Sequence, residues 1–195
     1  MRMSGFARRE QLVAVGRKTF ASKGFDGTSV EEIASQAKIS KPVIYEHFGG
    51  KEGLYAVIVD REVHALMSAL EAALDSQKRP RMILEDSALA LLSYIESNSD
   101  GFRILVRDAP QNSTSGSFSS LMGDIAIKVE HLLANQFSQA NMSPKWAPLY
   151  AQMLVGLIAQ VGQWWLDERR MSKEDVASHV VNLVWNGMRN LRPSP

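Results

Sequence analysis

The sequence predicts an all-α protein with a small N-terminal helical unit, residues 1–51, and a larger helical bundle, residues 52–195. Apolar residues recur at helical spacing through most of the chain, and no run alternates as a half-buried strand does. Pro80, Pro110 and Pro144 fall at three of the joints between helical segments. The 195 residues leave room for both parts, and the absence of cysteine excludes disulfides and thiolate metal sites.

The first predicted helix ends at Lys23, and Gly24 follows in the position where glycine commonly terminates a helix. Its apolar residues repeat at the spacing of a single buried stripe. The stripe consists of Leu12, Val13, Gly16, Thr19 and Phe20.

Two shorter helices are predicted next. The first opens with Thr28, which is expected to form a capping box with Glu31 three residues later. Ser40 is expected to cap the second, and Gly49-Gly50 closes it. One face of the first short helix is apolar, formed by Val30, Ile33, Ala34 and Ala37.

The second short helix is predicted to present polar groups outward. Ile44 and Phe48 lie four residues apart and would anchor it to its neighbours, which leaves Lys41, Tyr45 and His47 facing solvent. Short helices at a sharp angle, with cationic and hydrogen-bonding groups on the second, suit the major groove of DNA. These residues therefore predict a DNA-reading segment.

The charge distribution agrees with this prediction. Residues 1–51 hold nine Lys and Arg against five Asp and Glu, a net charge of +4, whereas residues 52–195 hold thirteen against sixteen, a net charge of −3. A basic unit attached to an acidic body fits phosphate binding by the first unit alone. The opening residues lack the pattern of a secretory signal, so we expect a cytoplasmic protein.

The first 55 or so residues resemble the tetracycline-repressor (TetR) family of bacterial transcription regulators. The resemblance implies a homodimer with an N-terminal DNA reader and a larger domain that dimerises and usually binds a small molecule. Gly16, Thr19 and Pro42 depart from the residues usual in the family. The matching residues are Phe20 to Val30, Ile33-Ala34, Ile39-Ser40-Lys41, Ile44 to Phe48, and Lys51-Glu52.

We predict contacts to DNA from the second short helix and from adjoining helix starts. The resemblance adds that family members use the matching positions mostly on phosphates, with positions 41 to 43 nearer the bases. Arg2, Arg8 and Arg9 could add phosphate or minor-groove contacts; the alternative is a solvated tail. The predicted DNA-binding residues are Thr28, Ser40, Lys41, Pro42, Val43, Tyr45, His47 and Lys51.

The body is expected to be helical throughout, and residues 111–120 to form a surface loop. The 21 uncharged residues from Trp146 to Leu166 could span a bilayer, but three glutamines and Pro148 favour a helix buried on several sides, which starts near Ala147 or bends there. We predict no membrane association. The expected helices lie near 51–76, 80–97, 100–108, 117–139, 144–169 and 173–191.

Apolar stripes on the last two helices predict a homodimer interface; the alternative is that both helices pack only within one subunit. The resemblance favours the interface, because family members dimerise through their last two long helices. The predicted interface residues are Leu157, Val161, Val180, Val184, Trp185 and Met188.

Polar and aromatic residues within apolar stretches of the body are candidates for lining a mostly apolar cavity for an unknown small-molecule effector. The alternative is a core filled by side chains, without a cavity. These ligand-binding candidates are His64, Tyr94, Phe102, Arg103, Gln160 and Trp164.

Catalytic chemistry is not indicated. The histidines are scattered without ligand spacing, and no nucleophile elbow, phosphate loop or dinucleotide motif occurs, so we expect no metal, no cofactor and no enzyme activity. The sequence predicts a regulator that binds a palindromic double-stranded operator as a homodimer, a repressor released by a small, largely hydrophobic effector. The alternatives are a constitutive or architectural DNA-binding dimer without effector, and an enzyme built on the bundle.

Overall fold

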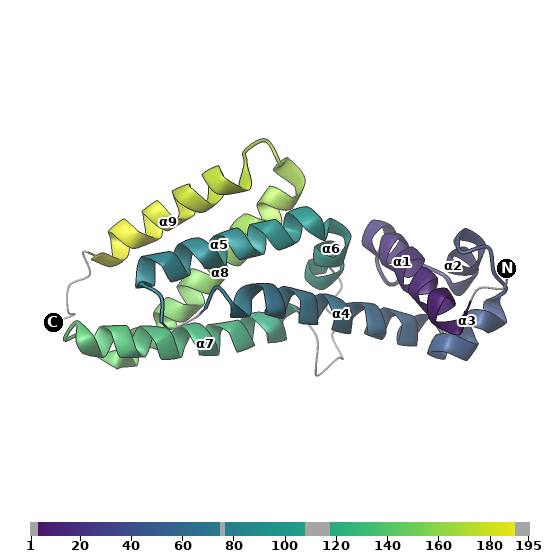
Figure 1. The fold of residues 1–195 in the computed structure, drawn as a ribbon, viewed down its shortest axis with the longest axis horizontal. Coiled ribbons are helices and arrows are strands. Elements are labelled where there is room, and N and C mark those ends of the chain that lie inside the picture. The colour runs from purple at the N-terminus through teal and green to yellow at the C-terminus, as the bar shows by residue number, and fades with distance from the viewer. Residues whose placement is uncertain (1–3, 75–76, 108–117, 190–195) are drawn as a thin grey trace. The chain divides into compact units, whose positions relative to one another are not determined.

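A computed structural model describes residues 4–74, 77–107 and 118–189, and all regular secondary structure within these ranges is helical (Figure 1). The all-α prediction is therefore confirmed. The helices are α1 Gly5–Lys23, α2 Val30–Gln36, α3 Lys41–Phe48, α4 Lys51–Glu71, α5 Pro80–Ser97, α6 Ser99–Arg107, α7 Phe118–Gln139, α8 Ala147–Glu168 and α9 Lys173–Arg189, with a 3₁₀ turn at Pro144–Trp146.

The chain forms two compact units. The first consists of Met1–Ala65 with Asn98–Phe118, and the second of Leu66–Ser97 with Ser119–Pro195. The three reader helices α1 to α3 thus share a unit with most of α4 and with α6. Because α4 runs on to Glu71, it contributes residues to both units.

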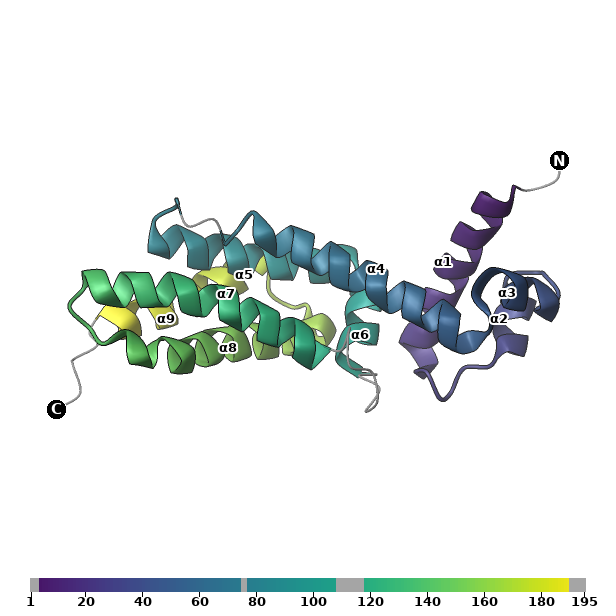
Figure 2. The same ribbon diagram turned by 90° about the horizontal axis from the view of Figure 1, so that it is seen from below.

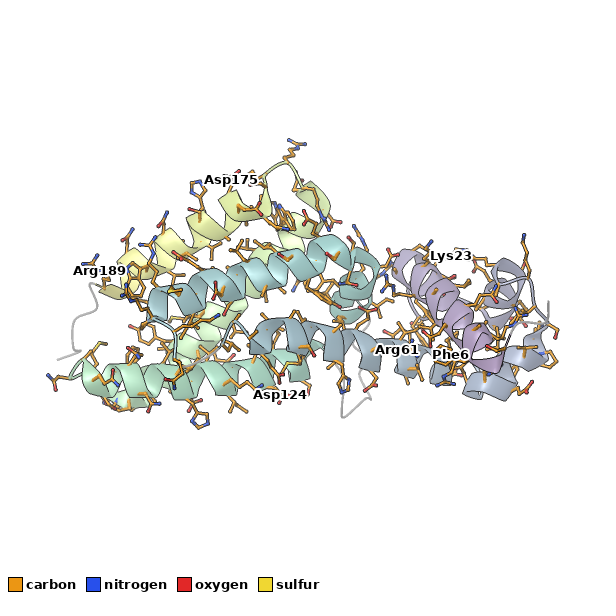
Figure 3. All side chains as sticks on the ribbon, in the orientation of Figure 1. Phe6, Lys23, Arg61, Asp124, Asp175 and Arg189 are labelled. Atoms are coloured by element: carbon orange, nitrogen blue, oxygen red, sulfur yellow. The ribbon has the colours of Figure 1, made fainter. Side chains whose placement is uncertain are left out.

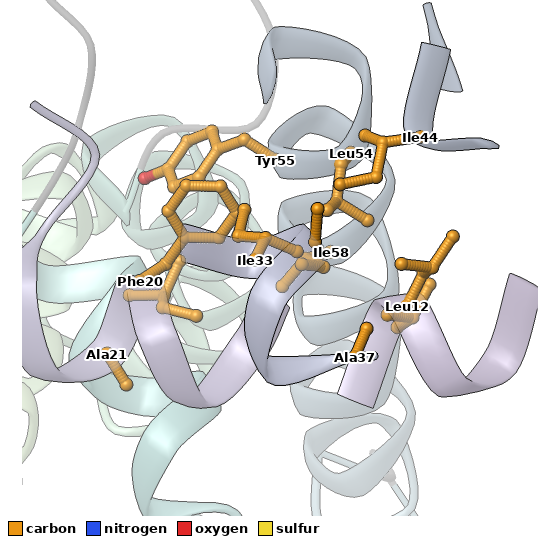
Figure 4. Packing of buried hydrophobic residues seen from close by; sticks show 12 residues of the cluster. Leu12, Phe20, Ala21, Ile33, Ala37, Ile44, Leu54, Tyr55 and Ile58 are labelled. Carbon is orange, nitrogen blue, oxygen red and sulfur yellow. The ribbon is translucent and has the colours of Figure 1, made fainter. Parts of the chain in front are cut away.

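The first unit is built around a core of large apolar side chains (Figure 4). Phe20 of α1 meets Tyr55 of α4 edge to face, with ring centres 5.1 Å apart, and Phe25 lies 4.9 Å from the same ring. Ile33 of α2 and Ile44 of α3 are fully buried in this core. Each buried aliphatic side chain of this size contributes roughly 1.5–3 kcal/mol relative to an exposed one. The core therefore fixes the geometry in which α3 is presented.

The caps of these helices follow the sequence with one shift. α1 ends at Lys23, as predicted, and Gly24 adopts φ 77°, a conformation that favours glycine. The cap of α2 is Ser29, whose hydroxyl accepts from the Glu32 N–H at 3.2 Å. The predicted box at Thr28 is wrong by one residue, because the Thr28 hydroxyl donates to the Gly24 carbonyl at 2.8 Å instead.

Gly16 permits a close approach of α1 to α4. A Cβ at this position would lie 3.0 Å from Leu54 Cδ2 and 3.1 Å from Ile58 Cδ1. Thr19, its buried neighbour in the stripe, is satisfied because its hydroxyl donates to the Val15 carbonyl at 2.9 Å. These two of the three departures from the family pattern are thus accommodated by packing and hydrogen bonding.

The second unit is a helical bundle in which α5 packs against α8 and α9, and Figure 2 shows α7 beside α8. Phe137 of α7 meets Tyr150 of α8 edge to face at 5.3 Å. Lys173 at the start of α9 pairs with Glu96 of α5, with 2.6 Å between Nζ and Oε2. The guanidinium of Arg169 caps the C-terminus of α5 by donating to the Ile95 carbonyl at 2.8 Å.

Some of the remaining predictions of helix bounds are confirmed and others are wrong. α8 begins at Ala147 with Pro148 in its first turn, one of the two expected solutions, because an N-terminal proline leaves no hydrogen bond unmade. α4 ends at Glu71, five residues earlier than expected. Of the predicted loop 111–120, residues 118–120 start α7 and the rest lies outside the described residues. Among the described helices, none is long and apolar enough to cross a membrane.

Candidate DNA interface and internal cavity

The outer face of α3 gathers the polar residues that the sequence singled out. Lys41, Pro42 and Tyr45 are exposed, Tyr45 by 55%, while Ile44 on the opposite side is fully buried. Val43 and His47 are half-buried. Gly49 then ends the helix with φ 75°, its N–H donating to the Tyr45 carbonyl at 2.8 Å. An exposed short helix with this composition fits a major groove.

Lys41 forms an ion pair within its own unit. Its ammonium donates to Oε1 of Glu31 on α2. This hydrogen bond holds the pKa of the Glu31 carboxyl below its ordinary value of 4.5. A phosphate that bound the Lys41 ammonium would have to displace the Glu31 carboxylate.

Thr28 and Lys51 hold the unit together. Thr28 is only 3% exposed and its hydroxyl is used by Gly24. The Lys51 ammonium donates to the Phe25 carbonyl at 3.0 Å and lies 4.1 Å from the centre of the Phe25 ring. Thr28 and Lys51, both predicted to contact DNA, therefore already have partners within the unit. The periodicity of the sequence does not reveal these partners.

The start of α3 and the start of α1 complete this face. Ser40 occupies the cap position of α3 and is exposed, yet its side chain makes no capping hydrogen bond. Arg9 donates to the His47 carbonyl at 2.6 Å, and its guanidinium lies 4.4 Å from the Phe48 ring centre, so it ties α1 to α3. Arg8 donates to Gln11 at 2.6 Å. Arg2, the third predicted arm residue, lies outside the described residues.

A cavity of about 130 Å³ lies within the second unit. Side chains of α4, α5, α7, α8 and α9 line it. Of the described residues that line it, all are apolar except Ser87 of α5 and Gln136 of α7. Pro80 and Gln136 are exposed, so they mark its mouth.

The predicted ligand-binding residues lie elsewhere. His64 is exposed and its Nδ1 lies 2.8 Å from the Asp60 carbonyl oxygen. Tyr94 and Phe102 are buried outside the cavity lining, and Arg103 is half-buried. Gln160 and Trp164 are exposed on α8. The prediction from the sequence relied on polar and aromatic residues within apolar stretches, whereas the cavity is lined almost entirely by the apolar residues of those stretches.

Three of the predicted interface residues face into their own unit. Val184 is 8% exposed and packs in a core with Leu133 and Phe137, while Trp185 and Met188 line the cavity. Val184, Trp185 and Met188 therefore contact their own subunit, and their role in a dimer interface stays a prediction. Leu157, Val161 and Val180 are half-buried.

A different apolar stripe lies on the exposed side of α8. Leu149, Met153 and Trp164 are exposed by 46%, 54% and 47%, and exposed Gly156 and Gln160 fall between them at helical spacing. A Cβ at Gly156 would meet nothing within 4 Å. On α9, Leu183 is 70% exposed. The uncharged length of α8 signalled this second face, but its register could not be assigned before the buried face was known.

The fold and the face of α3 define a helix-turn-helix DNA-binding protein. Residues 12–58 match the family described as bacterial regulatory proteins, tetR family, and residues 69–192 match the tetracyclin repressor-like C-terminal domain. The chain belongs to the TetR family of transcriptional regulators, a non-enzymatic family that binds operator DNA.

Individual relatives extend over nearly the whole chain. It is 25% identical over 199 residues to the HTH-type transcriptional activator FasR of Mycolicibacterium smegmatis, covering 94% of this chain and 84% of that protein. A TetR-like transcriptional regulator from Rhodococcus sp. RHA1 has a similar structure, with TM-score 0.82, 27% identity, and 97% and 100% of the two chains covered. AibR, solved with isovaleryl coenzyme A and operator DNA, shares the fold with TM-score 0.74, 17% identity, and 90% and 97% coverage.

Proposed function

We propose that this regulator binds a palindromic operator as a homodimer, with α3 in the major groove, and that a small, largely hydrophobic effector in the second unit releases it. The observation that carries the proposal is the exposed face of Lys41, Pro42 and Tyr45, held on a helix anchored by buried Ile44. Two such helices in a dimer enter successive major grooves when they lie about 34–36 Å apart, or a multiple of that distance.

The exposed stripe on α8 supports the homodimer. Large apolar side chains at Leu149, Met153 and Trp164 would be costly to leave in water, and Gly156 allows a second helix to approach closely. A stable interface buries at least about 1,200 Å² in total, so the stripe needs further contacts, for which Leu183 of α9 and the half-buried Leu157 and Val161 are placed on the same two helices.

The cavity supports an effector. An apolar cavity with few polar groups is the usual form of a small-molecule site. Leu70 of α4 lines it, while Leu54 and Ile58 of the same helix lie in the core that holds the reader helices. A ligand that shifts α4 changes the presentation of α3, and it weakens operator binding by its differential affinity for the two states.

A constitutive DNA binder is the competing proposal, and the cavity argues against it because a body without an effector has no need of one. The direction of regulation is a separate matter. FasR is an activator, so an operator placed upstream of a promoter could make this chain an activator also, with the same binding chemistry.

The proposal is tested by selecting duplexes from a random DNA library with the full-length protein. We expect inverted repeats whose half-site centres lie a whole number of helical turns apart, bound by two subunits for each repeat in sedimentation. Pro42→Ala should alter the selected half-site, because positions 41 to 43 are expected nearest the bases, whereas His179→Ala, exposed on α9, should retain it. Enrichment of single half-sites or no enrichment would reject the dimeric operator binder.

A further inference from the structure

Ser87 lines the cavity, and among the described lining residues it is the one whose polar atom is buried without a hydrogen-bond partner. Its Oγ is buried and has no hydrogen-bond partner among the described residues. A serine within a helix commonly donates to the carbonyl four residues earlier, here Ile83, but Ser87 does not. Native proteins rarely leave such a group unsatisfied, and an exception calls for an explanation.

The surroundings of Ser87 exclude a charged partner. None of the described residues that line the cavity is charged, and burying a carboxylate or an ammonium in such a lining is unfavourable. Of the cations within two residues of Pro80 in the sequence, Lys78 pairs with Asp86 at 2.6 Å and Arg81 with Glu85 at 2.8 Å, while Arg79 is exposed and is not among the lining residues. The buried part of a ligand must therefore be neutral.

Size limits the ligand further. The cavity measures about 130 Å³. An engineered cavity of about 150 Å³ in another protein binds benzene, so roughly six carbon atoms fit. Because the walls are largely aliphatic, a branched or short alkyl group fits the cavity without a special geometry.

We propose that Ser87 is the specificity-determining residue of this cavity and that, after rotation about its Cα–Cβ bond turns the buried hydroxyl toward the cavity, it donates a hydrogen bond to the carbonyl oxygen of a neutral aliphatic group of about six carbons. The inference rests on the proposed function and names the ligand class of that same cavity. Such a carbonyl belongs either to a free ketone or ester or to the acyl end of a thioester whose remainder stays outside the mouth. Gln136 at the mouth is exposed and offers an amide to the part that stays outside.

The test uses the full-length protein and two isosteric probes, 4-methyl-2-pentanone and 2,4-dimethyl-1-pentene, which differ in a carbonyl oxygen against a methylene group. Methyl NMR titrations give both dissociation constants for the wild type, for Ser87→Ala and for Ser93→Ala, a control on the same helix outside the lining. We expect Ser87→Ala to weaken ketone binding relative to alkene binding by about threefold to tenfold. Ser93→Ala should leave the ratio unchanged.

The unliganded variant supplies a second readout. If the Ser87 hydroxyl has no partner without ligand, Ser87→Ala should melt at the same temperature as the wild type or higher. A clear fall in melting temperature would mean that the folded protein uses the hydroxyl itself, and would overturn the proposal.

The outcomes separate this inference from the effector proposal. If both probes bind and their ratio is unchanged in Ser87→Ala, the Ser87 inference is wrong and the effector cavity stands. If neither probe binds any of the three proteins, both are wrong. Isovaleryl coenzyme A and free coenzyme A distinguish the sources: binding of the thioester alone supports an acyl group, and binding of the ketone without the thioester supports a free carbonyl compound.

Discussion

Lys41 on α3 and Lys51 at the start of α4 are the same residue type but differ in their surroundings. Lys41 is exposed and held by a surface carboxylate, whereas Lys51 is held by a carbonyl and an aromatic ring inside the unit. Surface ion pairs contribute little to stability, so the Lys41 ammonium can change its partner from the Glu31 carboxylate to a phosphate at a small cost in stability. Lys51 cannot leave its partners without loosening the contact between α4 and the loop at Phe25.

We therefore expect Lys41→Ala and Lys51→Ala to behave differently. Lys41→Ala should weaken binding to every DNA sequence and lower the salt slope by about one, with unchanged thermal stability. Lys51→Ala should lower the free energy of unfolding by about 1 kcal/mol. Fluorescence anisotropy at several salt concentrations, with thermal melts, separates the two effects.

The control for this comparison is Lys18→Ala, because Lys18 is exposed on α1, away from α3 in the sequence. Glu31→Gln should act in the opposite direction to Lys41→Ala and tighten binding, since it removes the carboxylate that competes with phosphate. Equal salt slopes for the wild type and Lys41→Ala would remove Lys41 from the DNA contacts.

A buried ion pair in the first unit depends on a glycine. Glu62 is 5% exposed, and its Oε1 lies 3.0 Å from Arg17 Nη1. A Cβ at Gly101 in the first turn of α6 would lie 1.9 Å from Glu62 Oε2, so the carboxylate occupies the space that a side chain would take. α1, α4 and α6 thus meet at one carboxylate.

Gly101→Ala should displace this carboxylate and lower the free energy of unfolding by about 1–3 kcal/mol, less than for a fully buried pair because Arg17 is one-third exposed. In the double variant with Glu62→Ala, part of the loss should disappear, because the added methyl group then has space. Guanidinium denaturation at a fixed protein concentration measures both. Additive losses in the double variant would show that the two sites do not interact.

At the scale of elements, Glu10 of α1 and Arg61 of α4 form a two-pronged ion pair, with oxygen–nitrogen distances of 2.7 and 2.8 Å; Arg61 is labelled in Figure 3. The Arg61 hydrogen bond holds the pKa of the Glu10 carboxyl below its ordinary value of 4.5. The charged form is therefore favoured in the folded protein. Its contribution to stability is present above the unfolded pKa and is lost as pH falls through the lowered folded value.

Glu10→Gln should consequently melt below the wild type at neutral pH, and the gap should close as pH falls below 4.5. The pair is solvent-exposed, so salt should also narrow the gap. Thermal melts across this range, with Glu46→Gln on the exposed side of α3 as control, make the comparison. A gap that stays constant down to the acid limit would refute the role of the carboxylate charge.

The exposed stripe of α8 makes the dimer testable with matched glycines. Gly156 on α8 and Gly123 on α7 both have space for a Cβ within their own subunit. Gly156→Glu should leave the subunit folded but weaken dimerisation at least about tenfold, because it puts charge and bulk into a close helix contact. Gly123→Glu should have no such effect. Sedimentation equilibrium measures both variants, and identical dimerisation constants would move the interface away from α8.

The bounds of the helices could largely be predicted from the sequence, but which helices pack against one another could not. The caps and apolar spacing of Gly24, Ile44 and Pro148 predicted where helices begin, end or turn inward, since these signals are local. Trp185 shows the limit: its stripe predicted an apolar face correctly, but whether that face meets its own subunit or a second one depends on how α5 and α9 pack. Ser87 gave no signal, because a lone serine in a helix looks like an ordinary surface residue.

On the scale of the whole molecule, the proposed regulator has an exposed DNA-reading face in one compact unit and a largely apolar cavity in the other. α4 supplies residues to the core of the first and to the lining of the second. Ligand and DNA would then be linked through a shared equilibrium, and each would weaken the binding of the other by the same factor. Typical coupling of this kind changes affinity about 5- to 150-fold.

The most direct test is the affinity of the full-length protein for its selected operator, measured by fluorescence anisotropy without and with a saturating compound that NMR places in the cavity. The proposed mechanism predicts an operator dissociation constant raised at least about fivefold by the compound, with the reciprocal weakening of the compound by operator DNA. An operator dissociation constant that is unchanged while the cavity is fully occupied would contradict it, and would leave a DNA-binding protein without effector control.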